Sequence, residues 1–342
     1  MSILRFLLFP FALLYDGITR LRNHLYTNGN KPSVEFDRTV ISVGNLNVGG
    51  SGKTPMIEYL ARLLQSKYKL AILSRGYGRK THGLRFAGNE DSAQTVGDEP
   101  YQYYRKFKDH VLVTVGEDRV LAIPEILHQQ PETDIVLLDD AYQHRAVKPQ
   151  FSILLTEFSR PFFKDYVLPM GMLREARRGA DRADVIVVTK CPPSISVEQQ
   201  KEITGQIRKY APEQPVFFSA IEYGVPQPIN GYKWENGGNI VLVSGIAQSK
   251  LFEANARSQF SVVHHFDFAD HHAYTKEDMK TIADFCRQQK SPVFILTTEK
   301  DMVKLLPFAE TLTSGWFYLP IETAFIDNGA EFDALIREAI QS

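Results

Sequence analysis

The chain has 342 residues, of which 44% are hydrophobic, and this is enough for two domains with packed cores. Lys and Arg (39) nearly balance Asp and Glu (40), so the composition argues against a polyanion binder and gives no reason to expect nucleic acid as a partner. Two cysteines, Cys191 and Cys286, lie too far apart for a metal-ligand spacing, which indicates free thiols in a reducing, cytosolic location.

Residues 1–26 are the most unusual part of the composition. The apolar run from Ile3 to Tyr15 is shorter than the about 20 residues of a transmembrane helix, and no convincing signal-peptide cleavage site follows it. Apolar residues recur at helical spacing: Leu7, Phe11, Leu14, Ile18, Leu21 and Leu25. Arg20, Arg22 and Asn23 lie off this stripe, which predicts an amphipathic helix with a basic side. Such a helix either docks on the protein's own core or lies on an anionic membrane surface. The apolar residues 6–9 favour the membrane, because they widen the stripe beyond what one packing partner needs.

Residues 38–46 form a β-branched apolar run that enters a glycine-rich turn, and residues 55–68 follow with helical periodicity. Further runs are typical of strands buried on both faces of a parallel sheet: 69–79, 110–115, 134–144, 151–157 and 184–190. Helical segments such as 99–107 and 119–128 lie between several of them. This alternation predicts a doubly wound, mostly parallel α/β domain over residues 27–218.

Residues 219–238 are rich in Pro and Gly and lack a helical period, which indicates a linker. A second, smaller α/β domain is expected over 239–342, with strands at 239–247, 260–266 and 292–298 and a helix near 276–289. The sequence does not indicate which of the two domains the last helix, 329–340, packs on.

The turn after the first strand, "VGNLNVGGSGKTP" at Val43–Pro55, ends like a nucleotide-binding P-loop. Asn47 stands where the first glycine is usual, and asparagine tolerates the left-handed conformation, so we expect the loop to keep its shape. Its backbone amides would surround phosphates, Lys53 would neutralise them, and Thr54 would offer a hydroxyl to Mg²⁺. The predicted nucleotide-binding residues are Asn47, Val48, Gly49, Gly50, Ser51, Gly52, Lys53 and Thr54. The fold class is therefore a P-loop NTPase-type α/β fold.

A P-loop needs a carboxylate near the metal, and Asp139 follows a buried strand in "IVLLDDAYQH". Asp139 would act on Mg²⁺ directly or through water, although a pair of aspartates after a strand is also commonly a helix cap. A switch GTPase is disfavoured, because Tyr142 and Pro193 stand where its glycine and its guanine-reading aspartate would be.

Seven motifs, in order from Val43 to Asp301, resemble the tetraacyldisaccharide 4'-kinases of lipid A synthesis. They are "VGNLNVGGSGKTP", "ILSRGYGR", "VGDEP", "LLDDAYQH", "GMLRE", "FADHHAY" and "TEKD". The resemblance implies transfer of the ATP γ-phosphate, with Mg²⁺, to the 4'-hydroxyl of a tetraacylated glucosamine disaccharide 1-phosphate. It also implies a peripheral protein on the cytoplasmic face of the bacterial inner membrane, with no obligatory protein partner. From the residues alone, a soluble P-loop small-molecule kinase and a regulatory ATPase remain alternatives.

The resemblance also suggests roles for the residues at the site. Asp98 is the candidate base, unless it merely caps the following helix, and His271, or less favoured His272, pairs with it. Together with Lys53 and Asp139 these form the expected catalytic set. Besides Thr54 and Asp139, Glu99 and Glu175 are candidate metal ligands. For Glu175 the alternative is an ion pair with a neighbouring basic group. Substrate-binding candidates are Arg75, Tyr77, Arg79, Arg119, Asp140, His144 and Arg174. Among them, Arg119 either binds the 1-phosphate or belongs to an ordinary helix start. The residues 299–301 are expected at the same cleft, without an assigned role.

Overall fold

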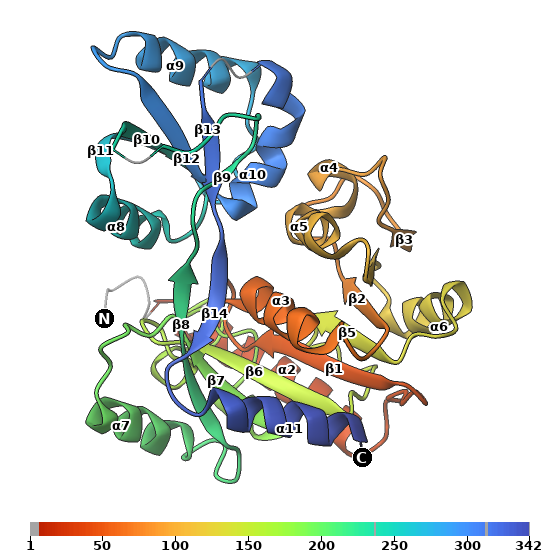
Figure 1. Ribbon diagram of the computed structural model, residues 1–342. Coiled ribbons are helices and arrows are strands. Elements are labelled where there is room, and N and C mark those ends of the chain that lie inside the picture. Colours follow the sequence, from red (N-terminus) through yellow and green to blue (C-terminus); the bar gives the residue numbers. More distant parts are fainter. Residues whose placement is uncertain (1–6, 236, 312–313, 342) are drawn as a thin grey trace.

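The computed structural model describes residues 7–235, 237–311 and 314–341. Two domains stand one above the other, joined by two long strands (Figure 1). The lower domain holds a nine-stranded sheet and the upper a five-stranded sheet.

The large sheet has the order β14-β8-β7-β6-β1-β5-β2-β4-β3. Its strands are β1 (Thr39–Asn45), β2 (Leu70–Ser74), β3 (Arg85–Phe86), β4 (Val111–Val115), β5 (Ile135–Asp139), β6 (Phe151–Glu157), β7 (Val185–Thr189), β8 (Val216–Tyr223) and β14 (Ile321–Phe325). All neighbours from β8 to β4 run parallel, and the two edge strands are antiparallel. In the register of β1 with β5, Val43 lies opposite Asp139. The ends of these two strands therefore lie side by side.

Helices cover both faces of this sheet, as the continuous apolar strands require. One face packs against α3 (Lys53–Leu64), α5 (Asp98–Phe107) and α11 (Gly329–Gln341). The other packs against α6 (Arg119–Gln129) and α7 (Val197–Ile207). The short α4 (Ala93–Val96) precedes α5. The neighbouring residues Val40 and Ile41 of β1 point into cores on opposite faces, the alternation of a buried strand.

The small sheet has the order β11-β10-β12-β13-β9. It comprises β9 (Gln227–Pro228), β10 (Asn239–Ser244), β11 (Ser261–Asp267), β12 (Val293–Thr298) and β13 (Trp316–Leu319). Helix α9 (Lys276–Arg287) covers one face and α8 (Ser249–Gln259) the other. Helix α10 (Glu299–Leu305) follows β12 and is directed toward α5 of the large domain (Figure 1).

The expected smaller domain of 239–342 differs from the observed arrangement at both ends. Strand β9 joins the small sheet from within the expected linker 219–238, and β8 extends through it to Tyr223. At the other end, β14 pairs antiparallel with β8, so that Phe325 lies opposite Ser219 in the large sheet. Helix α11 then packs on the large domain, with Phe332 and Ile336 fully buried. The chain returns because α11 supplies the apolar face that this part of the large sheet lacks.

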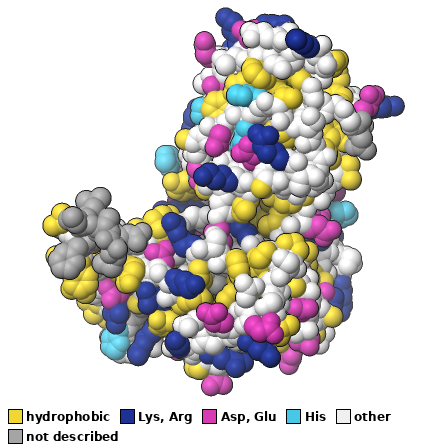
Figure 2. Space-filling model, turned by 90° about the vertical axis from the view of Figure 1, so that its left-hand side faces the viewer, with side chains coloured by type: hydrophobic (Ala, Val, Ile, Leu, Met, Phe, Trp, Pro, Cys, Tyr) yellow, Lys and Arg dark blue, Asp and Glu magenta, His cyan; other side chains and the backbone are white. Residues whose placement is uncertain are grey.

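Helix α2 (Phe9–Thr27) presents its apolar stripe to the outside. Leu7, Phe11, Leu14, Ile18 and Leu21 are each at least 60% exposed, whereas Ala12 and Thr19 on the opposite side are buried. The helix therefore docks on the protein through its opposite face, whereas most of the predicted stripe is exposed and Leu25 is partly buried. Figure 2 shows hydrophobic side chains gathered beside the grey N-terminal residues. Phe6, part of the expected stripe, lies outside the described residues, and in the part of the chain that is described no helix is long and apolar enough to cross a membrane.

Replacing Phe332 by Ala tests whether α11 belongs to the core of the large domain. Its ring lies 4.4 Å from that of Phe325 and 5.5 Å from that of Phe217, between centroids. Because a large buried ring is removed, the free energy of unfolding should fall by about 3–5 kcal/mol in urea denaturation. Glu338→Ala, an exposed change on the same helix, should change it by less than ~0.5 kcal/mol. Equal stability of Phe332→Ala and wild type would contradict the packing.

Candidate active site

The glycine-rich loop connects β1 to α3 at the end of the central strand. Gly49 (φ 117°) and Gly52 (φ 83°) adopt positive φ, which glycine tolerates. Asn47 does not, so the expectation that it substitutes for glycine through a left-handed conformation is wrong. Instead Asn47 forms an isolated antiparallel bridge with Leu173, and its side chain donates to Asp165 Oδ2 at 2.9 Å. The position thus anchors the start of the loop.

Lys53 begins α3, and its ammonium group lies close to the loop. Nζ is 3.3 Å from the Gly49 carbonyl oxygen and 3.3 Å from Asn45 Oδ1. It also lies 3.7 Å from Oδ1 of Asp140, just beyond β5. The charge that would meet a phosphate is therefore already placed between the loop and the end of β5.

The two aspartates at the end of β5 have different surroundings. Asp139 is buried and accepts a hydrogen bond from Ser74 Oγ at 3.0 Å; burial, with the negative charge of Asp140, raises its pKa to about 6. Asp140 receives two bonds from the Arg174 guanidinium, at 2.9 and 3.0 Å. Burial acts to raise the pKa of Asp140, but Lys53 and Arg174 together hold it below its usual range. Asp140 thus stays ionised while Asp139 carries the cost of a buried charge.

The metal ligands expected from the sequence can be tested against the donor set. The Tyr103 hydroxyl is buried beside the Thr54 side chain. Burial raises the pKa of Tyr103, the charges of Asp139 and Glu99 add to this, and a hydrogen bond with Thr54 opposes it. Thr54, Asp139 and Glu99 thus all act on the Tyr103 hydroxyl, and their oxygens are of the donor type that suits Mg²⁺. Within the described part of the chain, no group of three or more His, Cys, Asp or Glu side chains is placed so that it could hold a metal ion.

Glu175 departs from its expected metal role. Its carboxylate is buried and receives two bonds from Arg182, both at 2.9 Å. Asn23 Nδ2 at 2.6 Å and Gln143 Nε2 at 3.2 Å donate to the same group. The basic neighbour that the sequence left as the alternative is therefore present, as Arg182.

Asp98 and His271 meet across the space between the domains. His271 Nδ1 lies 3.4 Å from Asp98 Oδ2, and its ring is 5.5 Å from that of Tyr77, between centroids. His272 instead bonds Asp278 Oδ2 at 3.0 Å within the small domain. Asp98 makes no capping hydrogen bond, because Gly97 holds the capping position of α5. Of the alternatives left by the sequence, this geometry favours the pairing of Asp98 with His271.

Residues that the sequence did not assign complete this meeting point. Lys300 Nζ lies 2.9 Å from Glu99 Oε1 and 3.3 Å from His271 Nε2, and Lys304 Nζ lies 4.0 Å from Asp98 Oδ2. Burial acts to raise the pKa of Glu99, but Lys300 outweighs it and holds that pKa below its usual range. Lys300 belongs to the "TEKD" motif, which was the available signal, but its partner is distant in sequence.

Three non-glycine residues of this region have positive φ: Asp140 (49°), Lys190 (56°) and His271 (59°). Such backbone conformations cost free energy and concentrate at functional sites. Lys190 follows β7; its ammonium bonds the Gly50 carbonyl oxygen and, at 2.7 Å, Gln248 Oε1 of the small domain. The phosphate loop and the small domain thus share a contact that no motif indicated.

Three further residues predicted for the site, Arg119, His144 and Arg75, lie within electrostatic range of one another. Arg119 is buried, and burial lowers its pKa while Asp139 acts to raise it. Burial lowers the pKa of His144, and the charge of Arg119 lowers it further. Arg75 is exposed and lies within electrostatic range of both. The structure brings these three predicted residues together.

Two further substrate-binding candidates, Arg79 and Tyr77, differ in whether their side chains are free to contact a substrate. Arg79 is tied to Glu117 Oε1 and the Gly83 carbonyl oxygen, both at 2.6 Å, so it holds its own loop. Tyr77 remains 71% exposed. Asp118 caps the start of α6, because its side chain accepts hydrogen bonds from the amides of Val120 and Leu121. The Arg119 side chain is therefore not needed for capping.

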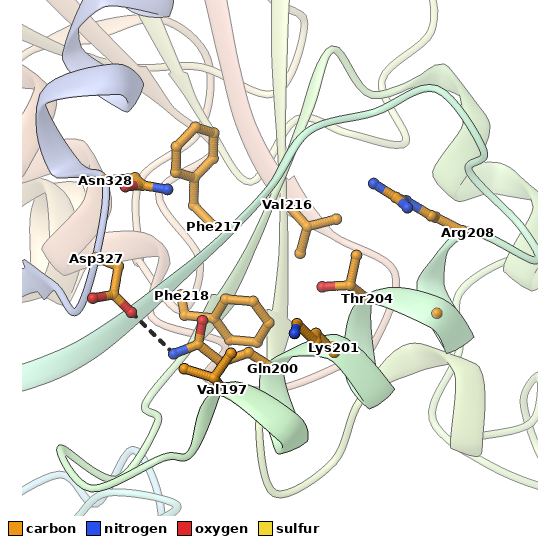
Figure 3. Close-up of a pocket in the computed structure, with 11 residues that line it drawn as sticks. Val197, Gln200, Lys201, Thr204, Arg208, Val216, Phe217, Phe218, Asp327 and Asn328 are labelled. Carbon is orange, nitrogen blue, oxygen red and sulfur yellow. Dashed lines mark hydrogen bonds between the residues drawn. The ribbon is translucent and has the colours of Figure 1, made fainter.

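A groove of 480 Å³ lies elsewhere, between α7, β8 and the segment before α11 (Figure 3). Gln200 and Asp327 bond across it at 3.0 Å. Its lining contains none of the predicted site residues, so we assign it no part in the site.

A glycine loop between a central parallel strand and a helix, with a lysine and a neighbouring strand-end aspartate, defines a P-loop nucleotide-binding protein. The family model described as tetraacyldisaccharide-1-P 4'-kinase matches residues 4–341. The chain belongs to this family, and the predicted fold class and family are both confirmed.

Individual relatives agree with the family model. The tetraacyldisaccharide 4'-kinase of Flavobacterium johnsoniae is 43% identical, over 100% of this chain and 98% of the relative. That of Flavobacterium psychrophilum is 42% identical over the same shares. The solved "apo" form of LpxK from Aquifex aeolicus, in complex with ATP, is 28% identical, covers 99% of this chain and 100% of that one, and has a TM-score of 0.78.

The pKa of Asp139 predicts a stability cost in the metal-free protein. A carboxyl group whose pKa is raised on folding destabilises progressively as the pH rises from 3.8 to about 6, and fully above it. With EDTA at pH 8, Asp139→Asn should therefore raise the free energy of unfolding, by at most about 3 kcal/mol. The gain should shrink as the pH falls toward 4.

Asp140→Asn is the matched control, because the pKa of Asp140 is lowered instead. Its contribution is present above the unfolded pKa and lost at acid pH, so this variant should be less stable than wild type at pH 8. Urea denaturation at several pH values measures both. The same sign for both variants would contradict the electrostatic assignment.

Proposed function

We propose that the protein transfers the γ-phosphate of ATP to the 4'-hydroxyl of tetraacyldisaccharide 1-phosphate, giving the 4'-phosphorylated lipid A precursor. The supporting observation is the contact of Asp98 with His271, next to Glu99, whose charge acts on the strand-end Asp139 beside the Lys53–Asp140 pair of the P-loop. A phosphate held by the loop and a hydroxyl held beside Asp98 would share one space.

ATP would bind through the loop residues 47–54, with their amides around the phosphates and Lys53 on the β and γ oxygens. Mg²⁺ would be held by Thr54 and Asp139, with Glu99 supporting them, and supplies neutralisation of the phosphate charge. Asp139 must be ionised for this role, and a pKa near 6 allows it at neutral pH.

Asp98 would accept the proton of the attacking 4'-hydroxyl. His271 Nδ1 lies 3.4 Å from Asp98 Oδ2, and Lys300 Nζ lies 3.3 Å from His271 Nε2. Because the ammonium group can only donate, Nδ1 carries the ring hydrogen, and the imidazole would orient the Asp98 carboxylate for proton abstraction. Lys300 and Lys304 keep positive charge beside the pair. These cations would offset charge that develops on the transferring group.

Arg75, Arg119 and His144 would hold the phosphate of the acceptor. The charges of Arg75 and Arg119 lie within mutual electrostatic range and repel one another, so an anionic ligand would relieve that cost. His144, whose pKa is lowered by burial, would serve as a neutral hydrogen-bond donor. Tyr77, exposed beside His271, would contact the sugar. Arg174 would fix Asp140, and Glu175, paired with Arg182, would hold Gln143 beside Asn45 at the start of the phosphate loop rather than bind metal.

Helix α2 would bring the protein to the membrane surface on the cytoplasmic side. Its exposed apolar stripe supports an interfacial position. The acceptor carries four acyl chains, and burying each methylene contributes about 0.8 kcal/mol, so extracting the lipid into water would be very unfavourable. An enzyme that works at the surface avoids that cost.

The Asp98→Asn variant tests the chemistry. With labelled ATP and tetraacyldisaccharide 1-phosphate, kcat should fall by about 10²–10⁴-fold because the base is lost, while ATP affinity changes little. Lys53→Ala is the comparison, and it should weaken ATP binding itself. Transfer by Lys53→Ala at the wild-type rate would refute the P-loop assignment, and acceptor-independent ATP hydrolysis would favour a regulatory ATPase.

The double change Leu14→Glu and Ile18→Glu tests the membrane role. Each removes about 1.5–3 kcal/mol of apolar burial, so binding to vesicles of anionic phospholipid should fall at least ~10-fold in a sedimentation assay. Leu121→Glu on α6 is the matched control, since Leu121 is equally exposed, and it should bind as wild type does. Undiminished binding of the double variant would contradict the membrane role of α2.

A further inference from the structure

Glu299 is a buried carboxylate of the small domain that the proposed chemistry does not use. It begins α10, is 2% exposed, and lies 2.7 Å from Lys106 Nζ on α5 of the large domain. Burial raises its pKa, Glu58 raises it further, and Lys106 opposes both. A buried charge of this kind is tolerated only while its partner stays in place.

Lys106 is shared between the two carboxylates. Its Nζ lies 2.6 Å from Glu58 Oε2, and Glu58 on α3 is fully buried. Glu58 also accepts from Gln102 Nε2 at 2.8 Å and lies 3.7 Å from Arg62 Nη1. One ammonium group therefore joins α3, α5 and α10.

These three helices carry the groups that must meet for transfer. Helix α3 begins with Lys53 of the phosphate loop, and α5 begins with Asp98 and Glu99. Helix α10 carries Lys300 and Lys304, which face the two acidic residues of α5. An apolar contact of Ala93 with Met302 and Val303 lies in the same interface. Both ends of α5 are thus tied to the small domain by ion pairs.

We infer that Lys106 is a positioning residue for phosphoryl transfer, which clasps α10 of the small domain to α3 and α5 and so sets Asp98 relative to the phosphate loop and His271. The inference rests on the proposed function. It assigns Glu299 of the "TEKD" motif the role of the small-domain end of this clasp. Without Lys106, Glu58 would keep Arg62 and Gln102, but Glu299 would lose its cation and face the Glu58 carboxylate, so the two domains would repel at this point.

The test compares Lys106→Met, Lys106→Arg and Lys106→Met/Glu299→Gln by steady-state kinetics. Misplacing a reacting group by about 1 Å can cost on the order of 10²-fold, so Lys106→Met should lower kcat by about 10- to 100-fold. KM for ATP should change by less than ~3-fold, because the phosphate loop is intact. Lys106→Arg should recover most of kcat, since the charge is kept.

The double variant separates a clasp from a general loss of stability. Replacing Glu299 by Gln removes the uncompensated charge, so it should restore kcat relative to Lys106→Met alone and also secure folding if Lys106→Met folds poorly. Lys148→Met is the matched control, because Lys148 forms an exposed pair with Glu35 at 2.8 Å. It should leave both kinetic parameters unchanged. Wild-type kcat for Lys106→Met, or no recovery in the double variant, overturns the inference.

A second measurement is independent of the acceptor. Spin labels at Glu202→Cys on α7 and Lys280→Cys on α9 report the distance between the domains, while both native cysteines are buried. Lys106→Met should broaden and shift this distance distribution, and the double variant should restore it. If wild type does not phosphorylate the disaccharide, the proposed function fails, and the distances still decide the clasp: an unchanged distribution in Lys106→Met overturns it.

Discussion

The ion-pair chain Lys53–Asp140–Arg174 is the interaction on which the site depends. It joins the phosphate loop, the end of β5 and the segment after residue 170 through contacts of 3.7 and 2.9 Å. Burial raises the pKa of Asp139, and the charge of the neighbouring Asp140, which these cations keep ionised, raises it further. Two adjacent carboxylates thereby acquire different tasks: one fixes the positions of Lys53 and Arg174, and the other remains available to a cation. The parallel register of β1 and β5 brings these groups together, so the electrostatics follow from the strand order.

Local patterns predicted what depends on local sequence. The phosphate loop, the buried strands and helices α3, α5, α6, α9 and α11 follow from apolar runs, helical period and glycine spacing. The return of β14 to the large sheet could not be predicted. The sequence of a five-residue strand does not indicate which strand it pairs with, and its partner β8 lies about a hundred residues earlier in the chain. Asn47 shows the same limit at one residue: its tolerance of positive φ is a local property, whereas its actual role comes from Leu173 and Asp165.

The candidate site divides in the same way. Lys53, Thr54 and Asp139 could be assigned from motif chemistry, because each stands at a strand end or helix start whose position is implied by the fold. The link of Asp98 to His271 needed the family resemblance, since no spacing rule connects residues of different domains. For Glu175 the sequence allowed either a metal-binding role or an ion pair with a basic residue. The structure shows the ion pair with Arg182, which lies in a short helical turn that has no periodic sequence pattern. Glu299 was expected at the cleft through the "TEKD" motif but without a role, and Lys106 gave no signal, because a buried ion pair between helices can be recognised only once both helices are placed.

Helix α2 reverses the usual arrangement of an amphipathic helix, and the reversal has a structural consequence. Its polar face is the one that contacts the protein: Arg22 donates to the Gln143 carbonyl oxygen at 2.6 Å, and Tyr15 donates to that of Arg174 at 2.9 Å. Asn23 reaches Glu175 at 2.6 Å. The contacted residues flank Asp140, so the helix that offers an apolar face outward is fastened to the segments that surround the candidate site. These directional hydrogen bonds fix the orientation of the helix, and they keep the apolar stripe directed away from the protein.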